Sequence, residues 1–264
     1  MGAHIPCRVR RPVLFLAVLA MGVAGCSGAG AGPSSSAALP STLAGDSATT
    51  TIDAWTARRE RMVDSQIESR GVADPLVLEA MRSVPRHLFV PADLVSDAYG
   101  DFPLPIGYGQ TISQPYVVAL MSEALHLQPG GRVLEVGTGS GYQAAVLAEM
   151  GMEVYSIEII PELAAGAAAN LAAAGYPSVV SRAADGYWGW EEHAPFQAII
   201  VTAAPDHVPE PLVAQLAPGG RMVIPIGPVG AVQTLWAFSK DAAGELVGEN
   251  LGPVRFVPFT RTEG

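Results

Sequence analysis

The sequence predicts an α/β fold, in which a mostly parallel sheet of seven strands is covered by helices on both faces and preceded by a helical extension. Two observations predict it. Short segments rich in β-branched residues alternate with alanine- and leucine-rich segments from residue 132 onward, and a glycine-rich turn joins the first strand to the first helix of that alternation. Such alternation is typical of βαβ units, whose strands lie parallel and are buried on both faces.

The helical extension is expected to contain two helices. Segment 55–70, WTARRERMVDSQIESR, places apolar residues at helical spacing and is followed by Gly71. The second helix, 74–84, begins with Asp74 as its cap and Pro75 in its first turn.

Prolines predict the backbone conformation of the segments between this extension and the sheet. The two prolines of PRHLFVP, 85–91, predict an extended segment. GQTISQP, 109–115, is expected to be a polar turn, and Pro115 opens a further helix that closes at Pro-Gly-Gly, 129–131.

The alternating region follows. No long helix separates its last two strands, so an antiparallel pair is expected at one edge of the sheet. Helices are expected at 142–150, 161–175 and 209–217, and strands at 132–136, 153–157, 178–182, 198–202, 221–226, 234–239 and 254–259.

Residues 1–26 have the pattern of an export signal: arginines, then an apolar run, then small residues. The alternative is a membrane anchor, but the apolar run is shorter than the roughly 20 residues that a spanning helix needs. The ending VAGC resembles the lipobox of bacterial lipoproteins, which implies a lipidated Cys26 and a location in the bacterial cell envelope; without use of the leader the protein would be cytoplasmic. Residues 27–51 are expected to be a flexible linker and 52–264 the folded domain.

Charge and cysteine content exclude several classes of function. The formal net charge of −10 argues against nucleic acid as a partner, because phosphate contacts need basic patches. The two cysteines are Cys7 and Cys26, so a mature chain has no internal disulfide. In the sequence, no Asp or Glu stands at metal-ligand or triad spacing from His87 or His207, so no metal site is expected and packing or substrate-groove roles are favoured.

A cofactor loop follows the first strand. Glycines 137, 139 and 141 let the backbone turn closely around a ligand, whereas Tyr142 stands where a dinucleotide fingerprint needs its third glycine. Glu158 ends the next strand, where a carboxylate can accept both ribose hydroxyls, and Asp185-Gly186 after the third strand is placed to hold an adenine amino group. Since the P-loop lysine is absent, the pattern predicts an adenosine site without phosphate-binding cations.

Longer segments carry a resemblance to one family. VLEVGTGSGYQAAVLAEM is similar to the first S-adenosylmethionine motif of class I methyltransferases, which have a Rossmann-like fold. MVDSQIESRGVADPLVLEAMRSVPRHLFVP, AYGDFPLPIGYGQTISQPYVVALMSEAL and LAPGGRMVIPIG resemble the protein-L-isoaspartate (D-aspartate) O-methyltransferases, from about residue 61 to 261. The resemblance implies methyl transfer from S-adenosyl-L-methionine to the α-carboxylate of isoaspartyl and D-aspartyl residues in damaged proteins. We expect a monomer that contacts a membrane only through a lipidated Cys26.

The resemblance implies that Ser113 orients the substrate carboxylate. No general base is needed, because a carboxylate with a pKa near 4 is already ionised at neutral pH. The residues expected to bind the cofactor, from the loop, the strand ends and the resemblance together, are Thr111, Ile112, Tyr116, Glu135, Gly137, Thr138, Gly139, Ser140, Gly141, Glu158, Asp185, Gly186 and Thr260.

Two alternatives remain open. S-adenosylmethionine is made in the cytoplasm, so the export signal motivates a non-enzymatic envelope protein that keeps the fold to bind peptides. A methyltransferase of the same fold acting on a small carboxylate is disfavoured by the helical extension and by GQTISQP.

Gln197 departs from the family, which usually has aspartate at this position. The resemblance implies that this strand supports the site without taking part in the chemistry.

Overall fold

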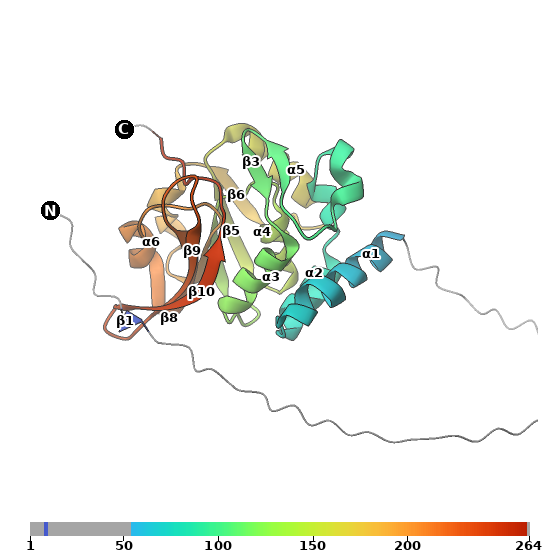
Figure 1. Ribbon diagram of the computed structural model, residues 1–264. Coiled ribbons are helices and arrows are strands. Elements are labelled where there is room, and N and C mark those ends of the chain that lie inside the picture. Colours follow the sequence, from blue (N-terminus) through green and yellow to red (C-terminus); the bar gives the residue numbers. More distant parts are fainter. Residues whose placement is uncertain (1–7, 10–53, 263–264) are drawn as a thin grey trace, which may run out of the picture. The chain divides into compact units, whose positions relative to one another are not determined.

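The computed structural model describes residues 8–9 and 54–262, and within them one large sheet organises the domain (Figure 1). Its strand order is β1-β10-β9-β8-β7-β4-β5-β6. The pairs β4–β5, β4–β7, β5–β6 and β7–β8 are parallel, whereas β8–β9 and β9–β10 are antiparallel, which confirms the expected mostly parallel sheet with an antiparallel edge. The strands are β1 Arg8–Val9, β4 Arg132–Val136, β5 Glu153–Glu158, β6 Val180–Ala183, β7 Phe196–Val201, β8 Leu216–Ile226, β9 Gln233–Lys240 and β10 Leu246–Val254.

The last strand lies earlier in the chain than expected. The prediction of a strand at 254–259 is wrong, because Asp241 forms a tight turn in which its Oδ1 accepts hydrogen bonds from the backbone N–H groups of Ala243 and Glu245, both at 2.9 Å. This turn starts β10 at Leu246. The chain beyond β10 instead crosses to Ala204, whose backbone N–H donates to the Val257 carbonyl at 2.9 Å.

The helical extension precedes the sheet as expected, with one difference. Asp74 caps α2 by accepting from the Leu76 N–H at 2.8 Å, and Gly71 ends the first helical run with φ of 98°. The segment after α2 is a 3₁₀ turn rather than extended chain, since its two prolines lie just outside that turn and leave its N–H groups available. The helical segments are α1 Ala54–Met62, η1 Val63–Ile67, η2 Glu68–Arg70, α2 Pro75–Ser83, η3 Arg86–Phe89, η4 Ala92–Asp97, α3 Pro115–Ala124, α4 Tyr142–Glu149, α5 Pro161–Ala173, η5 Gly186–Trp188, η6 Glu191–His193 and α6 Glu210–Gln215.

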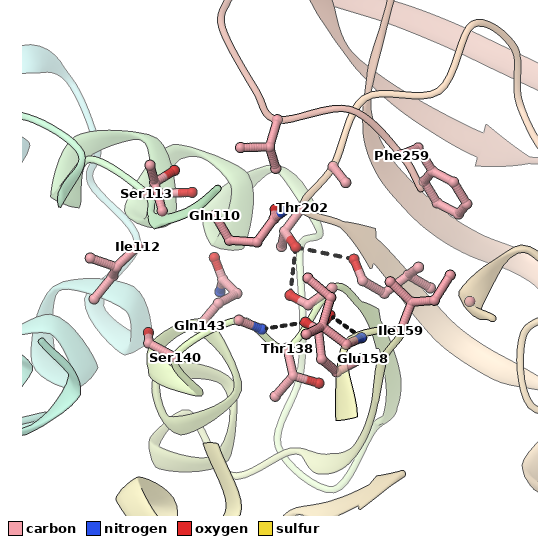
Figure 2. Close-up of a pocket in the computed structure, with 18 of the residues that line it drawn as sticks. Gln110, Ile112, Ser113, Thr138, Ser140, Gln143, Glu158, Ile159, Thr202 and Phe259 are labelled. Atoms are coloured by element: carbon pink, nitrogen blue, oxygen red, sulfur yellow. Dashed lines mark hydrogen bonds between the residues drawn. The ribbon is translucent and has the colours of Figure 1, made fainter. Parts of the chain in front are cut away.

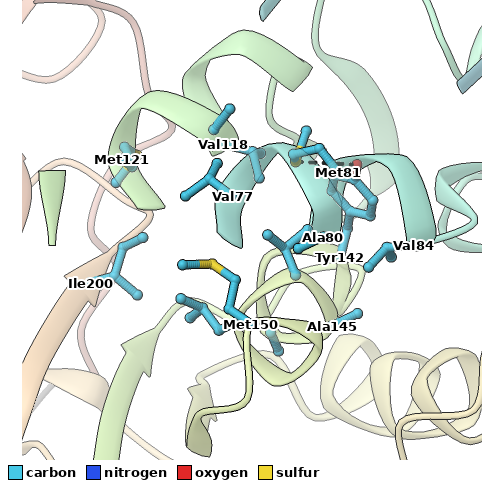
Figure 3. Packing of buried hydrophobic residues seen from close by; sticks show 14 of the residues in the cluster. Val77, Ala80, Met81, Val84, Val118, Met121, Tyr142, Ala145, Met150 and Ile200 are labelled. Carbon is cyan, nitrogen blue, oxygen red and sulfur yellow. Dashed lines mark hydrogen bonds between the residues drawn. The ribbon is translucent and has the colours of Figure 1, made fainter. Parts of the chain in front are cut away.

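Both faces of the sheet are buried. Along β7, Ala198 and Ile200 belong to one apolar cluster, while Ile199 and Val201 belong to a second cluster on the opposite face. Successive strand residues point to opposite faces, so this division shows two covered faces. Helices α2, α3 and α4 pack on the first cluster, as Figure 3 shows, and Leu212 of α6 belongs to the second. None of the helices in the described part of the chain has the length and apolarity of a membrane span.

A separate β-hairpin stands beside the sheet, formed by β2 Leu104–Gly107 and β3 Gln110–Ile112. Its tip, Tyr108 and Gly109, has φ values of 53° and 71°, a region that glycine enters without strain. GQTISQP is therefore a strand followed by a short link to α3, and not simply a turn. Ser113 lies in that link, immediately after β3.

Candidate active site

A pocket opens at the carboxyl ends of β4, β5 and β7, the position at which sheets of this type bind ligands (Figure 2). The hairpin, helices α3 and α4, Gly186 of η5 and the C-terminal segment complete its wall. Its lining residues are Gln110–Ser113, Val118, Met121, Val136–Ser140, Tyr142, Gln143, Ile157–Ile160, Gly186, Thr202, Ala203 and Val257–Thr260.

The glycine loop after β4 is held from beneath. The Thr202 hydroxyl donates to the carbonyl oxygens of Gly137, at 2.6 Å, and Val136, at 3.1 Å. Gly137 has φ of 99°, and a Cβ there would lie 2.3 Å from Thr202 Oγ1. Glycine is therefore required both for the backbone conformation and for the close approach of Thr202.

Glu158 fixes the same loop from the end of β5. Its Oε2 accepts from the Gly139 N–H at 2.8 Å and its Oε1 accepts from the Ile160 N–H at 3.0 Å. Each carboxylate oxygen has a second lone pair available to a ligand in the pocket, and the side chain lines that pocket. The geometry fits the expected acceptor of two ribose hydroxyls.

The Asp185-Gly186 pair contributes in two different ways. A Cβ on Gly186 would lie 2.4 Å from Val136 Cγ1, so only glycine lets this backbone form the pocket wall. Asp185 Oδ1 accepts from the Tyr187 N–H at 3.0 Å, and Oδ2 accepts from Arg261 Nε at 2.9 Å. Burial is the largest single effect and would raise the pKa of Asp185, but the hydrogen bonds from Arg261, Tyr187 and Thr262 and the charge of Arg261 together outweigh it and hold the pKa below its ordinary value.

Ser113 borders two cavities. It lines the pocket described above and also a neighbouring cavity, whose wall includes Thr111, Gln114, Val232 and residues 253–257. Figure 2 shows Ser113 and Glu158 on different sides of the first pocket. A hydroxyl at this border can contact a cofactor in the first cavity and a second reactant in the other.

Most residues predicted to bind the cofactor line the pocket. Tyr116, Glu135, Gly141 and Asp185 do not: the Tyr116 ring lies under the Arg70 guanidinium at 3.5 Å, and Gly141 is the N-cap of α4. The predicted cofactor-binding residues that do line the pocket are Thr111, Ile112, Gly137, Thr138, Gly139, Ser140, Glu158, Gly186 and Thr260.

Sequence reasoning missed several wall residues. Gln110, Gln143, Thr202 and Phe259 all line the pocket. Gln110 lies within GQTISQP and Gln143 within VLEVGTGSGYQAAVLAEM, so both could have been found from their position in these motifs. Thr202 lies 65 residues beyond Gly137 in the sequence, and its residue type carries no signal of its own.

The two histidines considered from the sequence lie outside the pocket wall. His87 stacks on Trp55, with ring centroids 4.5 Å apart, and its Nδ1 lies 2.8 Å from the Tyr99 hydroxyl. His207 is exposed and pairs with Asp206 at 2.5 Å. The part of the chain that the structure describes contains no group of three His, Cys, Asp or Glu residues placed to hold a metal ion.

Glu135 lies beneath the glycine loop and is completely buried. The Ser156 hydroxyl donates to its Oε2, and Oε1 has no hydrogen-bond partner among the described residues. Burial raises the pKa of Glu135 to about 8, an effect that the Ser156 hydrogen bond only partly offsets. The carboxyl group is therefore mainly protonated at neutral pH and supports the loop without contacting the pocket.

This raised pKa makes stability depend on pH. The folded state binds the Glu135 proton more tightly than the unfolded state, so its contribution is fully present below the unfolded pKa near 4.5 and is lost as pH rises to about 8. Glu135→Gln removes this dependence. Between pH 5.5 and pH 8.5 the wild type should lose up to about 1.4 kcal/mol of unfolding free energy per pH unit relative to the variant, so the Tm of the variant minus that of the wild type should increase with pH. Thermal unfolding monitored by circular dichroism measures it, with Glu79→Gln on the exposed face of α2 as the control. A pH-independent difference would contradict the assignment.

The pocket suits a cationic adenosine derivative. Among its lining residues, all in the described part of the chain, Glu158 is the single charged side chain, and neither lysine nor arginine is present. A phosphate-bearing nucleotide would find no cation there, whereas an adenosine attached to a positively charged sulfonium would meet no like charge in the pocket wall. S-adenosylmethionine has this charge, so the residues present fit it.

Comparison with known proteins decides the family. The family model described as "Protein-L-isoaspartate(D-aspartate) O-methyltransferase" matches residues 57–264. The chain belongs to this family. A protein-L-isoaspartate O-methyltransferase of Gloeobacter violaceus is 56% identical over 200 residues, covering 76% of this chain and 97% of the relative. One from Opitutus terrae is 57% identical over 208 residues, covering 79% and 89%.

Solved structures agree with this membership of the protein-L-isoaspartate O-methyltransferases. One structure of that name is 33% identical with a TM-score of 0.70; the match covers 76% of this chain and 65% of the solved chain. A Plasmodium falciparum protein, described as a beta-aspartate methyltransferase in complex with S-adenosyl-L-homocysteine, is 27% identical with a TM-score of 0.67, covering 76% and 98%. The predicted class I, Rossmann-like methyltransferase fold is confirmed.

Proposed function

We propose that this protein transfers a methyl group from S-adenosyl-L-methionine to the α-carboxylate of L-isoaspartyl and D-aspartyl residues in damaged proteins. The observation that carries this proposal is the position of Ser113 on the border of two cavities, in a chain that belongs to the family with this activity. Methylation of the carboxylate initiates repair, because the backbone amide nitrogen of the following residue can attack the carbonyl carbon of the ester and expel methanol, which closes a succinimide ring. The ionised carboxylate is a poor electrophile and has no comparable leaving group.

The residues of the first pocket would hold the cofactor. Glu158 would accept the ribose hydroxyls, and the backbone of residues 137–140 would lie close to the cofactor. When bound, S-adenosylmethionine supplies an electrophilic methyl group on a sulfonium. Val118 and Met121 line the pocket with apolar groups that exclude water from the reaction path.

Ser113 acts on the second reactant. Its hydroxyl donates a hydrogen bond to one oxygen of the substrate carboxylate, so that the other oxygen faces the methyl group. The serine stays neutral throughout and removes no proton. The cavity lined by Thr111, Gln114 and residues 253–257 accommodates the peptide on either side of that carboxylate.

A labelled-methyl assay tests the activity. The purified protein is expected to methylate an isoaspartyl peptide and to leave the peptide with ordinary aspartate at that position unmodified. Methylation of neither peptide, by folded protein that also fails to bind S-adenosylmethionine in calorimetry, would instead support a non-enzymatic peptide-binding protein. A rate independent of peptide length would support a methyltransferase for small carboxylates.

The pH dependence follows from the same chemistry. The substrate carboxylate is ionised above about pH 5, and Ser113 needs no deprotonation, so kcat should be constant within about twofold from pH 6 to pH 8. Initial rates at saturating cofactor and peptide measure it. A rate that rises tenfold for each pH unit in this range would show that a general base takes part.

We further propose that residues 1–26 are a lipoprotein-type signal and that Cys26 is lipidated in the cell envelope. Residues 27–51 would then be a linker and residues 52–264 the enzyme domain, and the protein would be a monomer. The sequence pattern supports this, but most of these N-terminal residues lie outside the described ranges. Arg8 and Val9 pair with β10, a contact that removal of the signal would abolish. The mass of the N-terminal peptide and membrane fractionation test the proposal, with Cys26→Ser expected to release the protein from membranes, and light scattering tests the oligomeric state.

A further inference from the structure

Arg86 is a fully buried arginine in the motif PRHLFVP and is followed by His87. It begins η3, the 3₁₀ turn that follows α2. It lines neither the cofactor pocket nor the neighbouring cavity. The charge of Arg86 is therefore not used to bind a ligand directly.

Its guanidinium contacts three segments of the chain, two of which contribute residues to the site. Nε donates to the Ala98 carbonyl at 2.7 Å, and Nη2 donates to the Ser113 carbonyl at 2.7 Å. Its Cζ lies 4.7 Å from the centroid of the Tyr142 ring, which lines the cofactor pocket at the start of α4. One rigid, planar group thus connects the chain after η4, the link that holds Ser113 and the helix that follows the glycine loop.

Burying a positive charge in a protein core costs free energy, because the charge loses its contact with water. Burial lowers the pKa of Arg86 to about 10, which shows that the protein interior disfavours its charge. Neighbouring core positions are filled by apolar residues such as Met81 and Phe89. For buried ion pairs, apolar residues of similar volume often give equal or greater stability, so stability is a weak reason for a guanidinium here and a positioning use is the better explanation.

That use follows from its contacts. The Ser113 link is short and connects β3 to α3, with one backbone carbonyl held by Arg86. Fixing this carbonyl limits rotation of the Ser113 backbone and with it the direction of the hydroxyl. A lysine could not replace the arginine fully, because a single ammonium group cannot reproduce the fixed angle between Nε and Nη2.

We propose that Arg86 is a positioning residue for the methyl-transfer reaction: by holding the Ser113 carbonyl it sets the direction of the Ser113 hydroxyl toward the substrate carboxylate. This role rests on the proposed function. Arg86 acts through Ser113 and touches neither reactant.

A double-mutant cycle separates this role from a general structural one. The variants are Arg86→Lys, Ser113→Ala and the combination, each assayed for kcat with the isoaspartyl peptide, for cofactor Kd and for Tm. Arg86→Lys is expected to lower kcat about tenfold in the wild-type background but less than about twofold in the Ser113→Ala background, since there is then no hydroxyl to direct. Its loss of Tm should be the same in both backgrounds, and the cofactor Kd should stay within about threefold.

Arg82→Lys is the matched control, because Arg82 forms exposed ion pairs with Asp64 and Glu68 on the same side of the domain, and it should leave kcat unchanged. If Arg86→Lys does not fold, Arg86→Gln, which keeps one donor, replaces it in the cycle at low temperature. An equal loss of kcat in both backgrounds, or no loss in either, would overturn the positioning role while the wild-type activity stands. Absence of wild-type turnover would overturn the proposed function and this role with it.

Discussion

Ser113→Ala is expected to lower kcat about 100-fold and to leave the Kd for S-adenosylmethionine within about threefold of the wild-type value. The hydroxyl lies on the border of the two cavities, so its loss leaves the cofactor contacts of Glu158 and the glycine loop in place. What is lost is the hydrogen bond that directs one carboxylate oxygen. Misdirection of the nucleophile lowers the fraction of bound substrate in a reactive geometry.

Single-turnover methyl transfer and calorimetry measure these two quantities separately. Ser69→Ala, at an exposed position in η2, controls for loss of a serine hydroxyl and should change neither. A Ser113→Ala protein with wild-type kcat would show that the link between β3 and α3 is only scaffolding. A fall in cofactor affinity with unchanged kcat would place the serine on the cofactor side.

The sheet was predictable because its signal is local. The strands β4, β5 and β7 are short, mostly apolar runs with buried residues on both faces, and each is followed by a helix, so the alternation along the chain indicates their positions. The last strand was misplaced because VRFVPF has the same composition as a strand. Its true position is set by the Asp241 turn, and the side-chain hydrogen bonds of such a turn are visible only in the structure.

The cofactor loop was predictable for a related reason. Glycine at 137, 139 and 141 reflects backbone geometry, and each of these residues has positive φ in the structure. Thr202 and Arg86 were missed because their roles depend on residues far away in the sequence. Thr202 holds Gly137, 65 positions earlier, and Arg86 holds Ser113, 27 positions later. Glu135 was assigned to the cofactor since it adjoins the loop, yet strand alternation turns its side chain into the protein interior.

Glu158→Gln is expected to raise the Kd for S-adenosylmethionine about 100-fold, with little change in kcat at saturating cofactor. The carboxylate accepts hydrogen bonds on both oxygens, from Gly139 and from Ile160. In the glutamine variant one oxygen becomes an NH₂ group, which must face one of these two N–H donors. The variant therefore loses a loop contact as well as an acceptor for the ribose, although it keeps the size of the side chain.

Comparison of two ligands separates these contacts from the effect of charge. S-adenosylhomocysteine has the same ribose but no positive sulfur. If Glu158 acts through hydrogen bonds to the ribose and the loop, both ligands should lose affinity by the same factor in calorimetry. A loss confined to S-adenosylmethionine would mean that the carboxylate acts on the sulfonium charge instead. Glu153→Gln, at the opposite end of β5 beside Arg132, should leave both Kd values unchanged, because that end of the strand lies away from the pocket.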